Sequence, residues 1–197
     1  MQAAETGAKE RLVAAAKEEF LAHGFKNASL RKICARAGVT TGALYFFFRS
    51  KEDLFCSIIE RTLSLYEELI QSILQSDWED PATALQNEER LIRFLMAHKE
   101  EYQLILEKSA GTKYEGFYAQ YQARMEAICS SYFEKNAPGN GNPELVKLLV
   151  SMRLQGYLEL MKEAITVEEA IQLAKYMACY ADAGLAALIK VLNSGKN

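Results

Sequence analysis

The sequence predicts an all-α fold: a small N-terminal three-helix domain joined by a long fourth helix to a larger C-terminal helical domain. Three prolines and eleven glycines are few in 197 residues, and a composition dominated by Leu, Ala, Glu and Lys favours helices. Half of the residues are hydrophobic, enough to fill a core at this length. Apolar stripes at helical spacing run along most of the chain and place the individual helices.

The first helix is predicted over Lys9–His23, and Gly24 is placed to end it in the left-handed conformation. Ser29 can cap a short second helix, which Gly38 would end. A third short helix fits Thr40–Phe48, with a threonine as its cap. The residues expected to face inward from these helices are Leu12, Ala16, Phe20, Leu30, Ile33, Ala37, Leu44 and Phe48.

The fourth helix is predicted to begin after Ser50, because Ser50-Lys51-Glu52-Asp53 is a capping-box pattern. An apolar stripe about six turns long follows it, long enough to bridge two domains. The stripe consists of Phe55, Ile58, Ile59, Thr62, Tyr66, Leu69 and Ile73. We therefore expect a domain boundary between residues 1–50 and 51–197.

Further helices are predicted near Pro81–His98, Glu101–Ser109, Tyr114–Lys135, Pro143–Glu163 and Val167–Asn193. The strongest break in the chain is the Pro, Gly and Asn-rich loop at residues 137–143. A second capping-box pattern, Thr166-Val167-Glu168-Glu169, precedes the last helix.

Several classes of protein are disfavoured. The longest stretch without Asp, Glu, Lys or Arg is Ala37–Phe48, twelve residues, whereas a membrane-spanning helix needs about 18 or more. Residues 1–7 lack the basic start and apolar run of a signal peptide. We expect a cytoplasmic protein without a membrane partner. The four cysteines lie far apart with no histidine nearby, which predicts buried free thiols, no metal site and no cofactor.

The charges are distributed unevenly. Residues 1–53 carry nine Lys and Arg against six Asp and Glu, whereas the remainder carries fourteen against twenty. Phe20–Lys51 contains no acidic residue at all, and we call it the acid-free segment. A short basic run is usually only a solvated face. The missing acids make nucleic acid the leading partner.

The acid-free segment also contains a helix-turn-helix pattern. Such a motif needs small residues where its helices cross, a glycine in the turn and apolar residues that lock the second helix. Cys34, Ala35 and Gly38 supply the first two features, and the apolar residues are Ile33, Ala37, Val39, Leu44 and Phe47 or Phe48. A plain helical corner gives the same pattern, but the charge context favours DNA.

The second helix of this motif would begin with the slim residues Thr40, Thr41, Gly42 and Ala43, which allow close approach to base edges in the major groove. Ser29 and Lys51 stand at helix starts, where N–H groups favour phosphate, and Tyr45 adds a hydroxyl. Three adjacent aromatics, at 46–48, cannot all face the core. Phe46 either packs or touches a thymine methyl or sugar.

Taken together, Ser29–Leu54 resembles the signature of TetR-type repressors. The similarity covers about a quarter of the chain and includes Gly38-Val39 in the turn, Leu44-Tyr45 in the recognition helix and Ser50-Lys51-Glu52 before the fourth helix. The resemblance implies a homodimer on a roughly palindromic double-stranded DNA operator, released when a small molecule enters the C-terminal domain.

The resemblance also assigns residues to DNA. Matching positions suggest Arg31, Thr40, Thr41, Ala43 and Phe46 near bases, and Ser29, Tyr45 and Lys51 on phosphates. One position departs from the pattern, because members of the family often have His where this chain has Phe47. The polar phosphate contact expected there is absent.

The middle helices are rich in aromatic and Met residues, which suit either a pocket or an ordinary core. Gln155 is a polar candidate if its helix faces inward. The residues selected as ligand-binding are Phe94, Tyr102, Tyr114, Phe117, Tyr121, Met125, Met152 and Gln155. This composition suggests an apolar or aromatic effector.

The last two helices carry small and apolar residues that suit a four-helix bundle between two subunits. They are Leu145, Leu149, Met152, Gly156, Ala170, Ala174, Met177, Ala181, Gly184, Leu185 and Leu188. An internal hairpin in a monomer remains the alternative.

These observations predict a ligand-responsive, DNA-binding transcriptional repressor rather than an enzyme. A di-iron carboxylate enzyme needs Glu-x-x-His pairs, and neither His23 nor His98 has Glu three residues before it. An architectural or activating factor with the same DNA-binding segment but no ligand remains open on the sequence alone.

Overall fold

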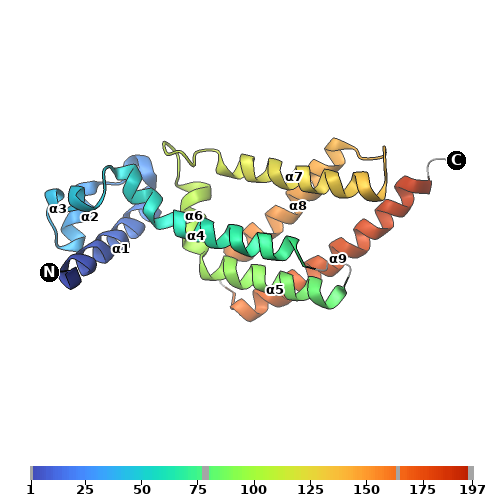
Figure 1. Ribbon diagram of the computed structural model, residues 1–197, viewed down its shortest axis with the longest axis horizontal. Helices are drawn as coiled ribbons and strands as arrows, with labels where there is room; N and C mark the ends of the chain where they lie inside the picture. Colours follow the sequence, from blue (N-terminus) through green and yellow to red (C-terminus); the bar gives the residue numbers. More distant parts are fainter. Residues whose placement is uncertain (1, 77–79, 163–164, 195–197) are drawn as a thin grey trace. The chain divides into compact units, whose positions relative to one another are not determined.

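The computed structural model describes residues 2–76, 80–162 and 165–194. Within these ranges the chain forms nine helices and no strand (Figure 1), so the predicted all-α fold is confirmed. The helices pack as two compact units. The N-terminal unit comprises Met1–Gln71 and His98–Phe117, and the C-terminal unit comprises Ser72–Ala97 and Tyr118–Asn197. These are units of packing, and the functional division expected after residue 50 stays a prediction.

The first three predicted helices are all present. α1 spans Gln2–Asn27, so it begins seven residues earlier and ends four residues later than predicted, whereas α2 (Leu30–Ala37) and α3 (Thr41–Phe47) lie close to their predicted positions. Gly24 and Gly38 have φ of 71° and 66°, a region that glycine enters without steric cost. Gly38 ends α2 as predicted, whereas the chain continues for one short helical turn beyond Gly24 before α1 ends.

The core of the N-terminal unit contains an aromatic cluster. Phe20 and Phe55 are fully buried, and their rings meet edge to face at 5.1 Å between centroids. Phe25 packs edge-on against Phe55 at 5.5 Å. Other fully buried side chains from α1, α2 and α3 are Leu12, Ile33 and Leu44. Because aromatic burial contributes several kcal/mol per ring, roughly 3–5 on truncation, this cluster anchors the α1–α3 bundle to the start of the fourth helix.

α4 spans Lys51–Leu74 and begins with a side-chain cap. Ser50 Oγ accepts a hydrogen bond from Asp53 N at 3.0 Å, and Asp53 Oδ2 accepts one from Arg49 N at 2.8 Å. The predicted cap is present, although the returning bond goes to the amide one residue earlier than in a standard capping box.

The C-terminal unit contains α5 (Pro81–Ala97), α7 (Phe117–Asn136), α8 (Pro143–Lys162) and α9 (Val167–Ser194), apart from the first residue of α7. α6 (Lys99–Glu107) belongs to the N-terminal unit. The helices predicted after residue 80 thus all exist, with described ends shifted by up to three residues. The predicted end of α8 at Glu163 lies outside the described residues. A core cluster joins α7 and α8 through Phe133, Val146, Val150 and Leu154.

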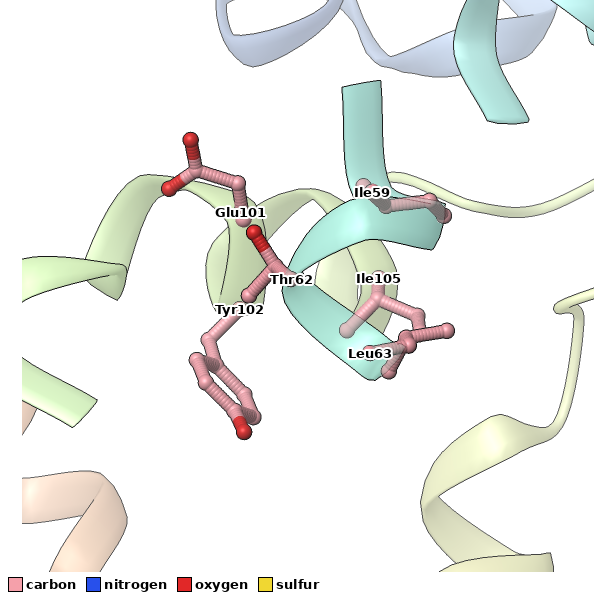
Figure 2. A pocket seen from close by; sticks show the side chains of 6 residues that line it. All are labelled: Ile59, Thr62, Leu63, Glu101, Tyr102 and Ile105. Carbon is pink, nitrogen blue, oxygen red and sulfur yellow. The ribbon is translucent and has the colours of Figure 1, made fainter. Parts of the chain in front are cut away.

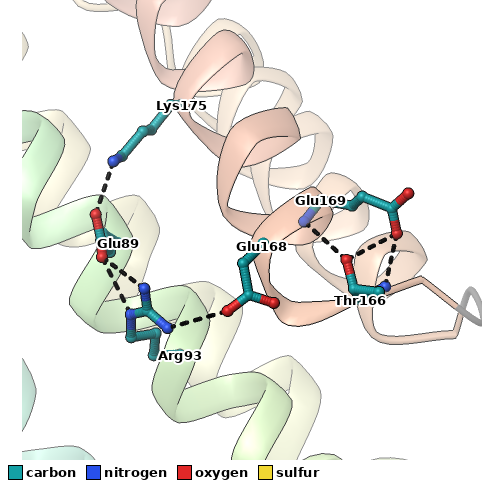
Figure 3. A network of polar contacts seen from close by, with 6 residues as sticks. All are labelled: Glu89, Arg93, Thr166, Glu168, Glu169 and Lys175. Atoms are coloured by element: carbon teal, nitrogen blue, oxygen red, sulfur yellow. Dashed lines mark hydrogen bonds and ion pairs between the residues drawn. The ribbon is translucent and has the colours of Figure 1, made fainter.

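α5 and α9 are joined by a surface network (Figure 3). Glu89 Oε2 accepts a hydrogen bond from Lys175 Nζ at 2.7 Å, and its other oxygen is bonded to Arg93. At the start of α9, Thr166 Oγ1 accepts from Glu169 N at 3.2 Å while Glu169 accepts from Thr166 N at 2.8 Å (Figure 3). The second predicted capping box is therefore confirmed.

A buried polar group lies between α5 and α8 in the same unit. Glu88, only 6% exposed, accepts hydrogen bonds from Tyr157 Oη at 3.0 Å and from Arg153 Nη2 at 2.9 Å. Arg153 Nε in turn donates to Tyr157 Oη at 3.0 Å. We call these three residues the buried triad. Burial raises the pKa of Glu88, and the charge of Arg153 opposes that rise.

Two expectations about side-chain burial are wrong. Cys34 and Cys56 are buried free thiols as predicted, but Cys129 is half-buried and Cys179 is exposed on α9. The second error concerns part of the expected dimer face, because several of its residues pack within the chain itself. Ala170 and Ala174 are fully buried, and Gly156 faces Met177 so closely that an added Cβ would overlap its Cε. Others of that set pack around the α7–α8 core cluster, namely Leu145, Leu149, Leu185 and Leu188.

Candidate nucleic-acid interface

The helix-turn-helix predicted at residues 29–48 is formed by α2 and α3 and is packed against α1. Ile33, Cys34 and Ala37 of α2 and Leu44 of α3 are buried beneath it. The turn is fixed by hydrogen bonds from Gly38 N and Val39 N to the carbonyls near the end of α2, at 3.3 and 3.0 Å. The apolar residues of the motif thus face the core, and its polar and small residues lie on the surface.

The tip of α3 is open to solvent. Thr40 is the N-cap, and its Oγ1 accepts a hydrogen bond from Ala43 N at 3.1 Å. Its hydroxyl proton remains to donate. Thr41 and Gly42 are exposed and Ala43 is half-buried. A Cβ on Gly42 would meet only Thr40 Oγ1, at 3.7 Å, so packing does not require a glycine there. The slim tip leaves room for a duplex.

Two aromatic side chains project from α3 into solvent. Phe46 is 75% and Tyr45 54% exposed. Phe47 is half-buried and stands edge-on to Phe46 at 5.1 Å between centroids, whereas Phe48 is buried. The expectation that at least one of the three phenylalanines is exposed is confirmed. An exposed phenylalanine that packing does not explain is an available contact for an apolar group of a partner.

The basic residues of the acid-free segment differ in their availability. Arg31 is exposed on α2. Arg36 forms an ion pair with Glu18 of α1 at 2.8 Å. Lys51 is half-buried: its Nζ donates to Lys26 O at 3.1 Å and lies 4.9 Å from the centre of the Phe25 ring. Burial lowers the pKa of Lys51. Its ammonium is held in place yet retains donors, since a lysine has three.

Ser29 is half-buried and caps α2, its Oγ accepting from Lys32 N at 3.4 Å. Its own amide donates to Glu19 Oε1 at 3.1 Å. Glu19 is 2% exposed and was missed by the sequence analysis, since a single glutamate at the end of a charged run gives no signal. It fixes the start of α2 from α1, so it positions the motif rather than contacting a partner.

The expected effector residues divide between the two units. Phe94, Tyr121 and Met125 are half-buried in the C-terminal unit, and the last two pack on the α7–α8 core cluster. Met152 is 54% exposed. Gln155 is exposed and bonded to Glu159 at 2.7 Å, so α8 does not turn it inward.

The other three expected effector residues belong to the N-terminal unit, where Tyr102 is buried and Tyr114 and Phe117 are half-buried. Tyr102 lines a recess between α4 and α6 (Figure 2). The recess has no room for a water molecule and is lined by Ile59, Thr62, Leu63, Glu101, Tyr102 and Ile105. In this conformation it is a packing irregularity rather than a ligand pocket.

No group of three or more His, Cys, Asp or Glu among the described residues is arranged to hold a metal ion. None of the helices in the described ranges is long and apolar enough to cross a membrane.

Residues 12–58 match the family described as bacterial regulatory proteins, tetR family. Among curated proteins, the chain is 36% identical over 104 residues to the HTH-type transcriptional repressor BepR of Brucella suis biovar 1. The matched residues make up 53% of this chain and 49% of BepR. The match thus spans about half the length of that relative.

Similarity of fold extends further than similarity of sequence. A transcriptional regulator from Aquifex aeolicus VF5 superposes with a TM-score of 0.59 at 23% identity, over 86% of this chain and 96% of that one. A TetR-like transcriptional regulator from Rhodococcus sp. RHA1 superposes with a TM-score of 0.65 at 18% identity, over 90% of this chain and 96% of that one. At these identities the likeness concerns the fold alone. The proteins named here are all transcriptional regulators or repressors by their descriptions.

Proposed function

The chain belongs to the TetR family of bacterial regulatory proteins, and from this premise we propose that it is a cytoplasmic transcriptional repressor. In this proposal it binds a roughly palindromic operator as a homodimer, and a small apolar or aromatic molecule releases it. The observation that carries the proposal is the exposed tip of α3, where Thr41, Tyr45 and Phe46 stand in solvent within the acid-free segment.

The arrangement supports assigned roles for the exposed side chains. The hydroxyls of Thr40 and Thr41 and the ring of Phe46 would meet base edges, together with Arg31 and Ala43. Ser29, Tyr45 and Lys51 would contact phosphates, the first and last at helix N-termini where the dipole favours an anion. α2 has no acid in its first turn to oppose that attraction, whereas α4 has Glu52 and Asp53 there, so at α4 the ammonium of Lys51 itself has to attract the phosphate.

The test is a gel-shift selection of genomic fragments at two salt concentrations. We expect one or a few fragments with an inverted repeat to bind specifically, and the logarithm of affinity to fall linearly with that of salt concentration. A binding curve that is flat in salt, or binding without preference among fragments, would overturn the proposal.

A dimer is proposed on the exposed apolar face of α8 and α9. Its residues are Leu148 and Met152 on α8 and Leu173, Tyr176, Tyr180 and Val191 on α9, between 45% and 75% exposed. Such a face on two helices is self-complementary about a two-fold axis and forms a four-helix bundle. Large apolar side chains that are exposed on two packed helices favour an association site there.

Tyr180→Glu is expected to raise the dimer dissociation constant at least tenfold, because it places two carboxylates in the centre of an apolar interface. Sedimentation equilibrium measures the effect. Lys190→Glu, an exposed charge change on the same helix, is the control and should leave the dimer intact. A wild-type chain that is monomeric at micromolar concentration would contradict the proposal directly.

The proposed effector site lies among the half-buried apolar side chains of the C-terminal unit. Phe94, Tyr121 and Met125 are half-buried, and flexible or aromatic side chains of this kind can open around an apolar ligand. A thermal-shift screen against aromatic and apolar compounds tests this, since a bound ligand stabilises the folded chain by mass action. A hit must also reduce operator binding. Operator binding without any such hit would favour a ligand-free architectural or activating factor.

A further inference from the structure

The loop between α6 and α7 packs against the two segments that hold Lys51. Lys108 O accepts a hydrogen bond from Phe25 N at 2.9 Å, beside the positive-φ Gly24 near the end of α1. Gly111 lies so close to Lys26 that an added Cβ would be 2.9 Å from its Cε. The loop therefore covers the end of α1, whose last carbonyls include the one bonded to Lys51.

The same loop is bonded to the start of α4. Lys113 N donates to Glu52 Oε1 at 2.7 Å, and Lys113 Nζ donates to Glu60 Oε1 at 2.7 Å. Glu52 lies in the first turn of α4, next to Lys51. The backbone bond is the more directional of the two, because its donor cannot swing away as an exposed ammonium can.

The loop is stiffened by its own hydroxyls. Ser109 and Thr112 are buried. Ser109 Oγ donates to Ile105 O at 2.7 Å, and Thr112 Oγ1 donates to Ser109 O at 2.7 Å while accepting from Tyr114 N at 3.1 Å. A loop with satisfied buried hydroxyls keeps one geometry. It can therefore impose that geometry on the segments that it contacts.

We infer that this loop is a clamp and that Glu52 is a positioning residue for DNA binding: its bond to Lys113 N fixes the first turn of α4, so that Lys51 faces an operator phosphate. The inference rests on the proposed operator binding and adds a part that the helix-turn-helix itself does not contain. The clamp acts on Lys51 from both ends, because Lys26 O and the Phe25 ring orient its ammonium and the same loop contacts Phe25 and Lys26.

The test compares Glu52→Met with Glu52→Gln in the full-length chain. Both remove the same charge from the first turn of α4, and Met and Gln have similar helix propensities, but only Gln keeps an acceptor for Lys113 N. We expect Glu52→Met to bind operator about fivefold more weakly than Glu52→Gln. We also expect its salt slope to be smaller by about two, because each subunit of the proposed dimer loses one phosphate contact.

Lys51→Met supplies the second measurement. When it is combined with each Glu52 variant, the affinity difference between the two should disappear, because the clamp would have no lysine left to position. Equal affinities and slopes for Glu52→Met and Glu52→Gln would overturn the inference, and so would a difference that persists without Lys51. If Glu52→Met had a lower melting temperature but the same salt slope as Glu52→Gln, the bond from Lys113 N to Glu52 would only stabilise the fold, and the inference would be wrong. If the wild type binds no operator, the proposed function itself fails, which is a separate result.

Discussion

Thr41→Glu is expected to weaken operator binding at least a hundredfold without destabilising the fold. The side chain is exposed at the first position of α3, directly after the cap at Thr40, where a carboxylate is favourable to the helix. On DNA it would face phosphates instead. A tenfold loss in each subunit multiplies to a hundredfold in a dimer, about 2.7 kcal/mol. Fluorescence anisotropy with a labelled operator measures the effect.

Two control variants show whether operator affinity depends on a negative charge at the tip of α3 or on any added negative charge. Ala123→Glu adds the same charge at an exposed position of α7 and should change affinity less than twofold. Thr41→Ser keeps the hydroxyl and should retain most of the binding. Melting curves should show Thr41→Glu as stable as the wild type. Operator affinity within threefold of wild type in Thr41→Glu would place the DNA surface elsewhere on the molecule.

The helices and their caps were predictable because the signals are local. Gly38, Ser50 and Thr166 each act within four residues through a backbone dihedral angle or a side-chain cap, so their effect can be read from neighbouring residues. The exposed tip of α3 was predictable for a related reason. Once Leu44 and Phe48 are placed inward by helical spacing, Phe46 must point elsewhere. Thr41 is exposed because it is the first residue of α3, next to the N-cap.

Tertiary arrangement explains what the sequence did not reveal. Ala170, Ala174 and Gly156 are small because α9 packs closely on helices of its own chain, and small residues look alike at an internal and an external contact. Glu19 and Glu52 find their partners 10 and 61 residues away. No periodicity links such residues, so neither the anchor of α2 nor the loop clamp follows from the pattern.

Arg153→Met is expected to lower the free energy of unfolding by about 2 kcal/mol at neutral pH. Removing one partner of a buried ion pair costs about 3–5 kcal/mol, and the figure is reduced here because the Arg153 side chain is 39% exposed and its site admits water. Glu88, 6% exposed at its side chain, would keep only the Tyr157 hydroxyl, with Asp182 nearby to repel it. Urea denaturation between pH 5.5 and 7.5 measures the effect.

The pH dependence of the stability lost in Arg153→Met shows whether the unpaired Glu88 carboxylate causes that loss. Burial already raises the pKa of Glu88 while Arg153 opposes the rise, so the variant should raise it further. A raised pKa means that the folded chain holds this proton more tightly than the unfolded chain, and stability is gained as pH falls towards that pKa. The deficit of Arg153→Met should therefore shrink from pH 7.5 to 5.5. The double variant Glu88→Gln/Arg153→Met should lose less stability than Arg153→Met alone. Its loss should not change with pH, because no carboxylate is then buried at this site. An equal deficit at both pH values would mean that lost packing, and not the stranded charge, destabilises the variant.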